Sequence, residues 1–134
     1  MIVEEAVRNA LNELTYDGTF QIEQIIYDEK YFGNVLAVLK SNMKVDIRFT
    51  RDRGNFWCEI GQTGEWYFIE DVFCVIGIKS AIKNNEFLDM IADTSKIIKI
   101  NSKKIFLAFD TKNSQNTKSK IKTFAINRAM GMFK

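Results

Sequence analysis

The sequence predicts an α+β fold, with an N-terminal helix, an antiparallel meander of four to five strands, and then helices packed against the sheet. Apolar residues recur at helical spacing near both ends of the chain, whereas short alternating or β-branched segments fill positions 20–69. Strands and helices that are segregated along a chain in this way are typical of α+β domains. The 134 residues contain no proline, no repeat and no low-complexity tract, so we expect a single domain, residues 1–134.

The N-terminal helix is predicted over residues 2–15. Its first turn carries Glu4 and Glu5, where the helix dipole favours negative charge. Its apolar positions follow the i, i+3, i+4 spacing of a helix that buries one stripe, and they are Val3, Ala6, Val7, Ala10, Leu11 and Leu14.

Five segments are predicted as strands: residues 20–28, 31–40, 43–50, 55–61 and a shorter one at 65–69. Residues 31–40 are almost continuously apolar, which suits a central strand or one covered on both faces. Residues 43–50 alternate cleanly, which predicts an antiparallel strand with one buried and one wet face. The buried side of that strand should carry Met43, Val45, Ile47 and Phe49.

The polar stretch "RDRGN", residues 51–55, joins two of these strands. Gly54 can supply the positive φ that a tight hairpin turn needs, so we expect a turn here. The strand that follows should bury Phe56, Cys58 and Ile60 and turn Trp57 and Glu59 to the opposite face.

The remainder of the chain is predicted to be helical. Residues 70–77 form a short helix with Val72, Phe73 and Ile76 inward. Residues 84–109 form a long helix that the polar pair Asn101 and Ser102 divides, with a loop over 110–119 and a last helix over 120–133. The inward stripe of the long helix should consist of Phe87, Ile91, Thr94, Ile98, Ile105 and Phe109.

Missing residue types exclude several kinds of catalysis. The chain has no histidine, which removes the commonest general base and the commonest zinc ligand. Its two cysteines, Cys58 and Cys74, do not form a CxxC motif and fit two buried free thiols. Neither the phosphate-binding motif GxxxxGK[ST] nor the dinucleotide-binding motif GxGxxG is present. No spacing of carboxylates or lysines singles out a catalytic residue. We therefore expect no enzyme activity, no catalytic residues, no cofactor and no metal.

The solvent-exposed face of the predicted sheet is the best candidate for a binding surface. A tryptophan beside arginines has the composition of a protein–protein hot spot. A C-terminal helix that covered this side would instead make Trp57 part of a second core, and the sequence leaves both possibilities open. The candidate protein-binding residues are Arg48, Arg51, Asp52, Arg53, Trp57, Glu59 and Trp66.

Charge is distributed unevenly along the chain. Residues 1–94 hold 9 Lys/Arg and 16 Asp/Glu, a net charge of −7, whereas residues 95–134 hold 10 Lys/Arg and one acid, a net charge of +9. This pattern indicates either an interaction tail or two parts of the fold that attract each other. Clustered lysines also make nucleic acid a candidate partner of region 95–134, although no RNA- or DNA-binding motif is present.

Several short motifs resemble a known family. They are "YFGN" (31–34), "DRG" (52–54), "WxEIG" (57–61), "EW" (65–66) and "EDV" opening a helix (70–72). Over residues 20–77 the chain is similar to small cytoplasmic bacterial immunity proteins that are encoded beside polymorphic or contact-dependent inhibition toxins. The resemblance implies a protein without catalysis that binds its cognate toxin and blocks it.

Two functional hypotheses follow, with a third held open. The first is an immunity protein that neutralises a toxin in a tight stoichiometric complex; the acidic first 94 residues would suit a basic nuclease. The alternative is a nucleic-acid-associated protein that uses region 95–134. The third is a subunit of a larger assembly with Trp57 and Trp66 in an obligate interface. An acidic N-terminus without an apolar run predicts a cytoplasmic protein without membrane contact.

Overall fold

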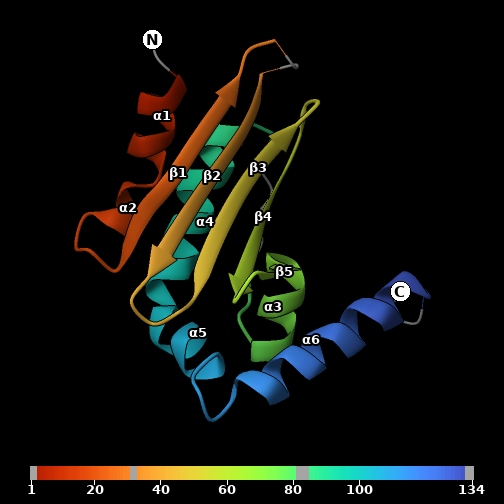
Figure 1. Ribbon diagram of the computed structural model, residues 1–134. Coiled ribbons are helices and arrows are strands. Elements are labelled where there is room, and N and C mark those ends of the chain that lie inside the picture. The colour runs from red at the N-terminus through yellow and green to blue at the C-terminus, as the bar shows by residue number, and fades with distance from the viewer. Residues whose placement is uncertain (1–2, 31–32, 81–84, 132–134) are drawn as a thin grey trace.

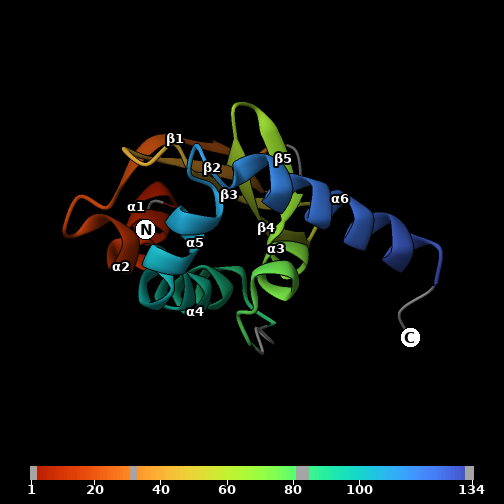
Figure 2. The ribbon, with the colours of Figure 1, turned by 90° about the horizontal axis from the view of Figure 1, so that it is seen from below.

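A computed structural model, which describes residues 3–30, 33–80 and 85–131, confirms the α+β class. One antiparallel sheet forms the first layer, and helices on one of its faces form the second (Figures 1 and 2). The helices of that layer are α1 (Val3–Ala10), α2 (Asn12–Thr15), α4 (Phe87–Ile100) and α5 (Ser102–Ala108). Helices α3 (Ile69–Ile76) and α6 (Ser114–Ala129) pack on each other beyond the last strand.

The sheet is a five-stranded meander in the order β1-β2-β3-β4-β5, in which all neighbours are antiparallel. The strands are β1 (Phe20–Asp28), β2 (Asn34–Ser41), β3 (Asp46–Asp52), β4 (Asn55–Gln62) and β5 (Glu65–Phe68). All five predicted strands are present. The first two positions predicted for the second strand, 31 and 32, lie outside the described residues, and β2 pairs on both sides as a central strand.

The "RDRGN" stretch contains the predicted hairpin turn. Asp52 pairs with Asn55 across the turn, and the two residues between them, Arg53 and Gly54, have φ values of 53° and 83°. Two consecutive positive φ angles in a two-residue loop define a type I′ turn, whose twist matches that of the strands it joins. The turn was predicted from Gly54; the left-handed conformation of Arg53 was not.

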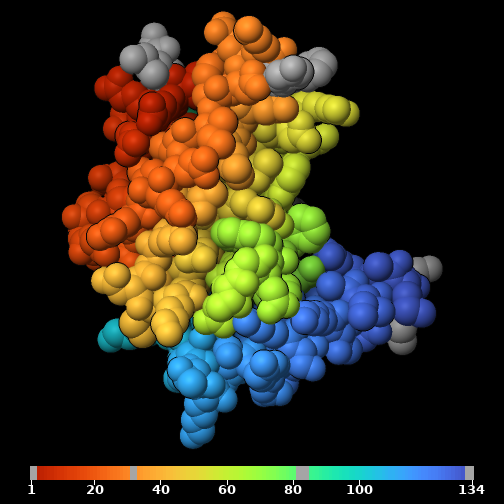
Figure 3. All heavy atoms as spheres, in the orientation of Figure 1, coloured from red at the N-terminus to blue at the C-terminus, as the bar shows by residue number. Residues whose placement is uncertain are grey.

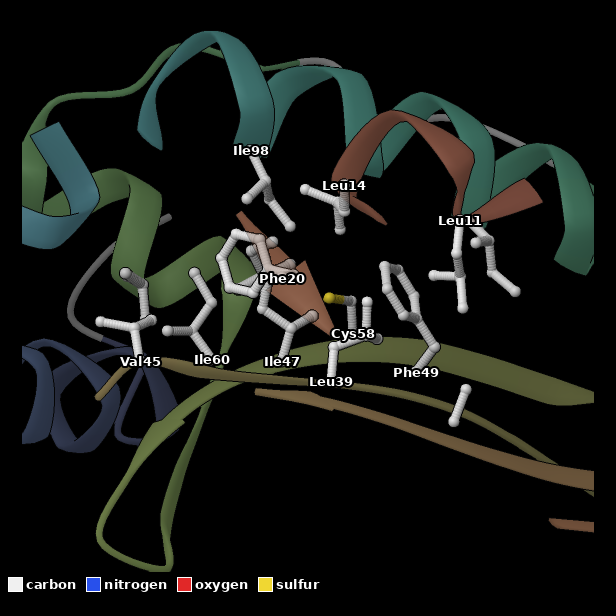
Figure 4. Packing of buried hydrophobic residues seen from close by; sticks show 14 of the residues in the cluster. Leu11, Leu14, Phe20, Leu39, Val45, Ile47, Phe49, Cys58, Ile60 and Ile98 are labelled. Atoms are coloured by element: carbon white, nitrogen blue, oxygen red, sulfur yellow. The ribbon is translucent and has the colours of Figure 1, made fainter. Parts of the chain in front are cut away.

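The core lies between the sheet and the helical layer (Figure 4). The predicted alternation of β3 and β4 is confirmed at Ile47, Phe49, Cys58 and Ile60, which are all buried. The inward stripe predicted for the long helix is buried as well, and that helix divides at Asn101 as expected.

Met43 was wrongly placed in the core. It is 54% exposed, because residues 42–44 form the turn between β2 and β3 and β3 begins only at Asp46. Lys44 adopts a positive φ of 61° in this turn. The turn interrupts the alternation that the sequence pattern extended back to residue 43.

Helix α6 begins six residues before its predicted start and replaces most of the predicted 110–119 loop. Tertiary contacts stabilise this polar first turn. The Thr117 hydroxyl donates a hydrogen bond of 2.6 Å to the Ala108 carbonyl, and the Lys118 ammonium lies 3.6 Å from a Glu65 carboxylate oxygen. Such contacts supply the stability that the low intrinsic helix propensity of this segment lacks.

Ion pairs join the basic C-terminal third to the acidic remainder of the chain. Four basic side chains cross between these parts, and the pairs are Lys99–Asp17, Lys118–Glu65, Lys122–Glu65 and Arg128–Asp71. Hydrogen bonds from Lys99 and Thr19 hold the pKa of Asp17 well below its usual range. Of the two explanations left open by the sequence, mutual attraction of two parts of the fold is therefore realised.

The longest described helix, α6, has 16 residues, and no helix in the described part of the chain is long and apolar enough to cross a bilayer.

Candidate binding site: the open face of the sheet

The sheet face opposite the helices is uncovered by any described helix. In Figure 3, which views this face, residues 20–68 form the front of the molecule, and α5 and α6 appear only below and to the right. The question of whether a helix covers Trp57 is thereby answered: the described chain leaves its face open. This surface, named the open face, carries Gln24, Ile26, Asp28, Leu36, Val38, Lys40, Asp46, Arg48, Thr50, Trp57, Glu59, Trp66 and Phe68.

Strand register arranges the open face in cross-strand rows. One row joins four strands through directly opposed residues, in the order Ile26, Leu36, Thr50, Trp57. The next row joins all five strands, in the order Gln24, Val38, Arg48, Glu59, Phe68. Directly opposed side chains on one face of a sheet contact each other, so each row is a continuous strip of surface.

Glu59 lies at the centre of the open face and organises it. Its Oε1 atom accepts hydrogen bonds from Arg48 Nε at 2.9 Å and from Trp57 Nε1 at 3.1 Å, and Arg48 Nη2 lies 2.8 Å away. The Glu59 side chain is only 12% exposed and that of Arg48 28%. A partly buried, charge-assisted pair of this kind is stronger than an ordinary surface ion pair.

Trp66 completes the cluster from the edge strand. The Arg48 guanidinium carbon lies 4.3 Å from the centre of the Trp66 ring, which is a cation–π contact. The ring lies against Gly61, its cross-strand partner, where a side chain would collide with it. Arg48 is thus held by Glu59 and Trp66 together, so contacts within the sheet fix the position of its side chain.

Four of the seven predicted site residues therefore form one cluster: Arg48, Trp57, Glu59 and Trp66. Asp52 lies at the end of the open face that borders the Arg53–Gly54 turn, and its carboxylate is half exposed. Arg53 is in the turn itself, where its backbone N–H donates to Asn34 Oδ1 at 2.9 Å.

Arg51 was wrongly placed on this surface. It is opposed by Val35 and Phe56, so its side chain points to the helical side of the sheet. There its guanidinium donates to the Gly33 carbonyl at 2.9 and 3.1 Å and lies over the Phe87 ring. Its role is to fasten the start of β2 to β3.

The sequence did not identify Ile26 and Leu36 as members of the open face. A β-bulge between Ile22 and Gln24 shifts the alternation of β1, and this turns Ile26 outward to 45% exposure. Leu36 belongs to a continuously apolar strand, whose pattern does not tell one face from the other. Only the register could have revealed these two residues.

The two thiols differ in their surroundings. Burial raises the pKa of the Cys58 thiol well above its usual value, which makes it unreactive at neutral pH. Cys74 is free but exposed, contrary to the expectation of two buried thiols. Among residues 3–30, 33–80 and 85–131, no three acidic or cysteine side chains lie close enough to hold a metal ion.

The Arg48–Glu59 contact can be measured with a double-mutant cycle. We expect Arg48→Met and Glu59→Gln each to destabilise the fold, and the pair to show a coupling free energy of about 1 kcal/mol. Urea unfolding of the four proteins gives this value. The exposed pair Lys40–Glu23, at 3.3 Å, is the control and should couple by less than about 0.5 kcal/mol. Equal coupling in the two pairs would contradict the described order of the open face.

Comparison of the chain with protein-family models, with curated proteins and with solved structures gave no match. The resemblance to immunity proteins consequently remains a prediction from the motifs, and the function is argued from the geometry of the open face.

Proposed function

We propose that this chain is a non-catalytic binding protein whose open face docks a protein partner, and that it acts as an immunity protein that neutralises a cognate bacterial toxin. The observation that carries the proposal is the ordered Arg48–Glu59–Trp66 arrangement with Trp57 beside it. Trp and Arg in a well-packed central position are the residues that dominate binding energy at protein interfaces. Side chains fixed before binding also lose little entropy on complex formation.

Apolar side chains around this cluster extend the surface in a way that supports docking. Phe68 and Ile26 are each 45% exposed at opposite margins of the open face, and Leu36 and Val38 lie between them. An uncovered apolar strip with a central charged pair has the mixed composition of non-obligate protein interfaces.

Net charge contributes little to this proposal. Residues 20–68, which supply the whole open face, contain seven acids and six bases, a net charge of −1. The acidic excess of the first 94 residues lies instead in α1, α2, α3 and α4 and the segments beside them. The expectation that a basic nuclease would be steered to this protein therefore does not follow from the open face, and recognition depends on its shape and its tryptophans.

Alanine substitution tests the proposal directly. The chain is co-expressed with the toxin encoded beside it, and the complex is isolated and its Kd measured. We expect Trp57→Ala and Trp66→Ala each to weaken binding by about 30-fold or more, the effect of removing a central hot-spot side chain. Tyr16→Ala, an exposed aromatic on the helical side, should change the Kd by less than about threefold. The proposal would be contradicted if none of the three variants bound more weakly, or if all three lost affinity to the same extent.

Nucleic-acid binding by region 95–134 is less well supported by the geometry. Three acids, Asp17, Glu65 and Asp71, form ion pairs with four of its ten basic residues, and Lys104 donates to the Gly77 carbonyl. We expect a titration with duplex or single-stranded DNA at about 50 mM salt to be flat. Saturable binding that weakens steeply with salt would restore this alternative.

A further inference from the structure

A groove of about 340 Å³ crosses the end of the open face nearest the 52–55 turn. Its floor is the cross-strand row of Ile26, Leu36, Thr50 and Trp57. This row is apolar except for one hydroxyl, so the floor suits an aliphatic or planar group rather than a strongly hydrated one.

Two carboxylates, Asp28 and Asp52, line the groove along one side of this floor, together with Asn34, the cross-strand partner of Asp28. Asp28 Oδ1 accepts the Lys30 backbone N–H at 3.0 Å, and Asp52 Oδ1 lies 3.9 Å from the exposed Arg53 side chain. Within the residues that the structure describes, the Oδ2 atoms of both carboxylates accept no hydrogen bond. The groove therefore combines an apolar floor with unused acceptor capacity for a cation.

The arginines nearest the groove, Arg51 and Arg53, form no strong ion pair with these two carboxylates. Arg51 is among the residues that line the groove, but its guanidinium donates to the Gly33 carbonyl and lies over the Phe87 ring on the helical side of the sheet. The Arg53 side chain is 76% exposed, and its long contact with Asp52 is of a kind that contributes little to stability. An incoming cation would displace a weak contact at most.

We propose that this groove receives one arginine side chain of the protein partner. The aliphatic part of that side chain lies along Ile26 and Leu36, and its planar guanidinium reaches Asp28 and Asp52 beside the Trp57 ring. Arginine fits better than lysine, because its fork of donors can serve two acceptors and its plane stacks on an aromatic ring. The inference deepens the proposed function and rests on it, since the partner supplies the side chain.

A short peptide tests the groove without the toxin. The probe is the tripeptide acetyl-Gly-Arg-Gly-amide, and the matched probe replaces arginine by citrulline, its neutral isostere. In ¹H–¹⁵N spectra of the full chain we expect saturable shifts of the Trp57 indole signal and of the Leu36 and Thr50 amides, with a Kd on the order of 10 mM. The citrulline peptide should bind about tenfold more weakly or not at all.

Two double variants with the same net charge complete the test. Asp28→Asn with Asp52→Asn should weaken the arginine peptide about tenfold, whereas Glu5→Gln with Asp89→Asn, which alters exposed helical carboxylates, should not. Equal binding of the two peptides, shifts outside the groove, or no saturation up to about 100 mM would overturn the inference. Peptide binding without any toxin complex would instead overturn the proposed function and leave the groove intact.

Discussion

Replacing Gly61 by alanine is expected to destabilise the fold by about 2–3 kcal/mol, in the range of overpacked positions. A Cβ atom at this position would lie 2.6 Å from Trp66 Cε3 and 2.8 Å from the Glu65 carbonyl oxygen. The second of these atoms is backbone, so rotation of a side chain cannot relieve the collision. Strand β5 must move away from β4, and the Arg48–Trp66 contact is then lost.

Urea unfolding measures this loss of stability. The matched control is Gly54→Ala, where a Cβ meets nothing within 4 Å but the positive φ of 83° is retained. We expect that variant to lose only about 1 kcal/mol, the cost of an alanine in the left-handed region. If the two variants were equally stable, the close packing of Trp66 on Gly61 would be contradicted.

Removing the Arg128 side chain is expected to destabilise the protein by about 2–3 kcal/mol at about pH 7. Arg128 Nη2 lies 2.9 Å from Asp71 Oδ2, and the Asp71 carboxylate is buried with its Oδ1 atom lacking any hydrogen-bond partner among the described residues. Arg128→Met keeps most of the aliphatic chain but leaves this carboxylate without a cation. The loss stays below that of a fully buried pair, because the arginine itself is half exposed.

The pH dependence of this loss has a definite sign. Burial raises the pKa of Asp71 above its ordinary value of 3.8, and Arg128 opposes that rise. A carboxyl group whose pKa is raised in the folded state stabilises the fold fully below its ordinary pKa and loses that contribution as the pH rises through the folded value. Without Arg128 the pKa of Asp71 rises further, so the electrostatic deficit of the variant is largest near neutrality.

Unfolding at about pH 7 and about pH 4 checks this behaviour. The difference between wild type and Arg128→Met should shrink as the pH falls, because Asp71 becomes protonated in the folded state of both proteins and a neutral carboxyl no longer needs the cation. Lys122→Met removes an exposed partner of Glu65 from the same helix and should cost less than about 1 kcal/mol at neutral pH. A pH-independent difference for Arg128→Met would show that lost packing alone causes it.

The spacing of apolar residues predicted the strands and the long helices well. Each of these elements buries one face in the same core, so its apolar residues alternate in a strand and recur every three or four residues in a helix. The Arg53–Gly54 turn was predicted from its glycine alone, since few residues other than glycine favour positive φ. The first turn of α6 was missed, because its polar sequence is helical only through contacts with residues far away in the chain, such as Glu65.

The candidate site was predictable in part for the same reason. Trp57 and Glu59 follow from the alternation of their own strand, and Arg48 from that of its neighbour. The sequence prediction placed Arg51 on the wrong face of the sheet. Side chains alternate between the two faces along a strand, and the sequence beside a turn does not show at which residue the strand pairing ends. Ile26 depended on a bulge in β1, which no pattern in that strand announces.

Trp57 and Trp66 are the only tryptophans in the chain, and both lie on the open face. Their two indole N–H signals in a ¹H–¹⁵N spectrum therefore report on this surface and on no other. When an inactive form of the proposed partner toxin is added, we predict that both signals shift and that the change is complete at one equivalent. A stable complex that leaves both indole signals unchanged would contradict the central claim that the open face is the docking surface.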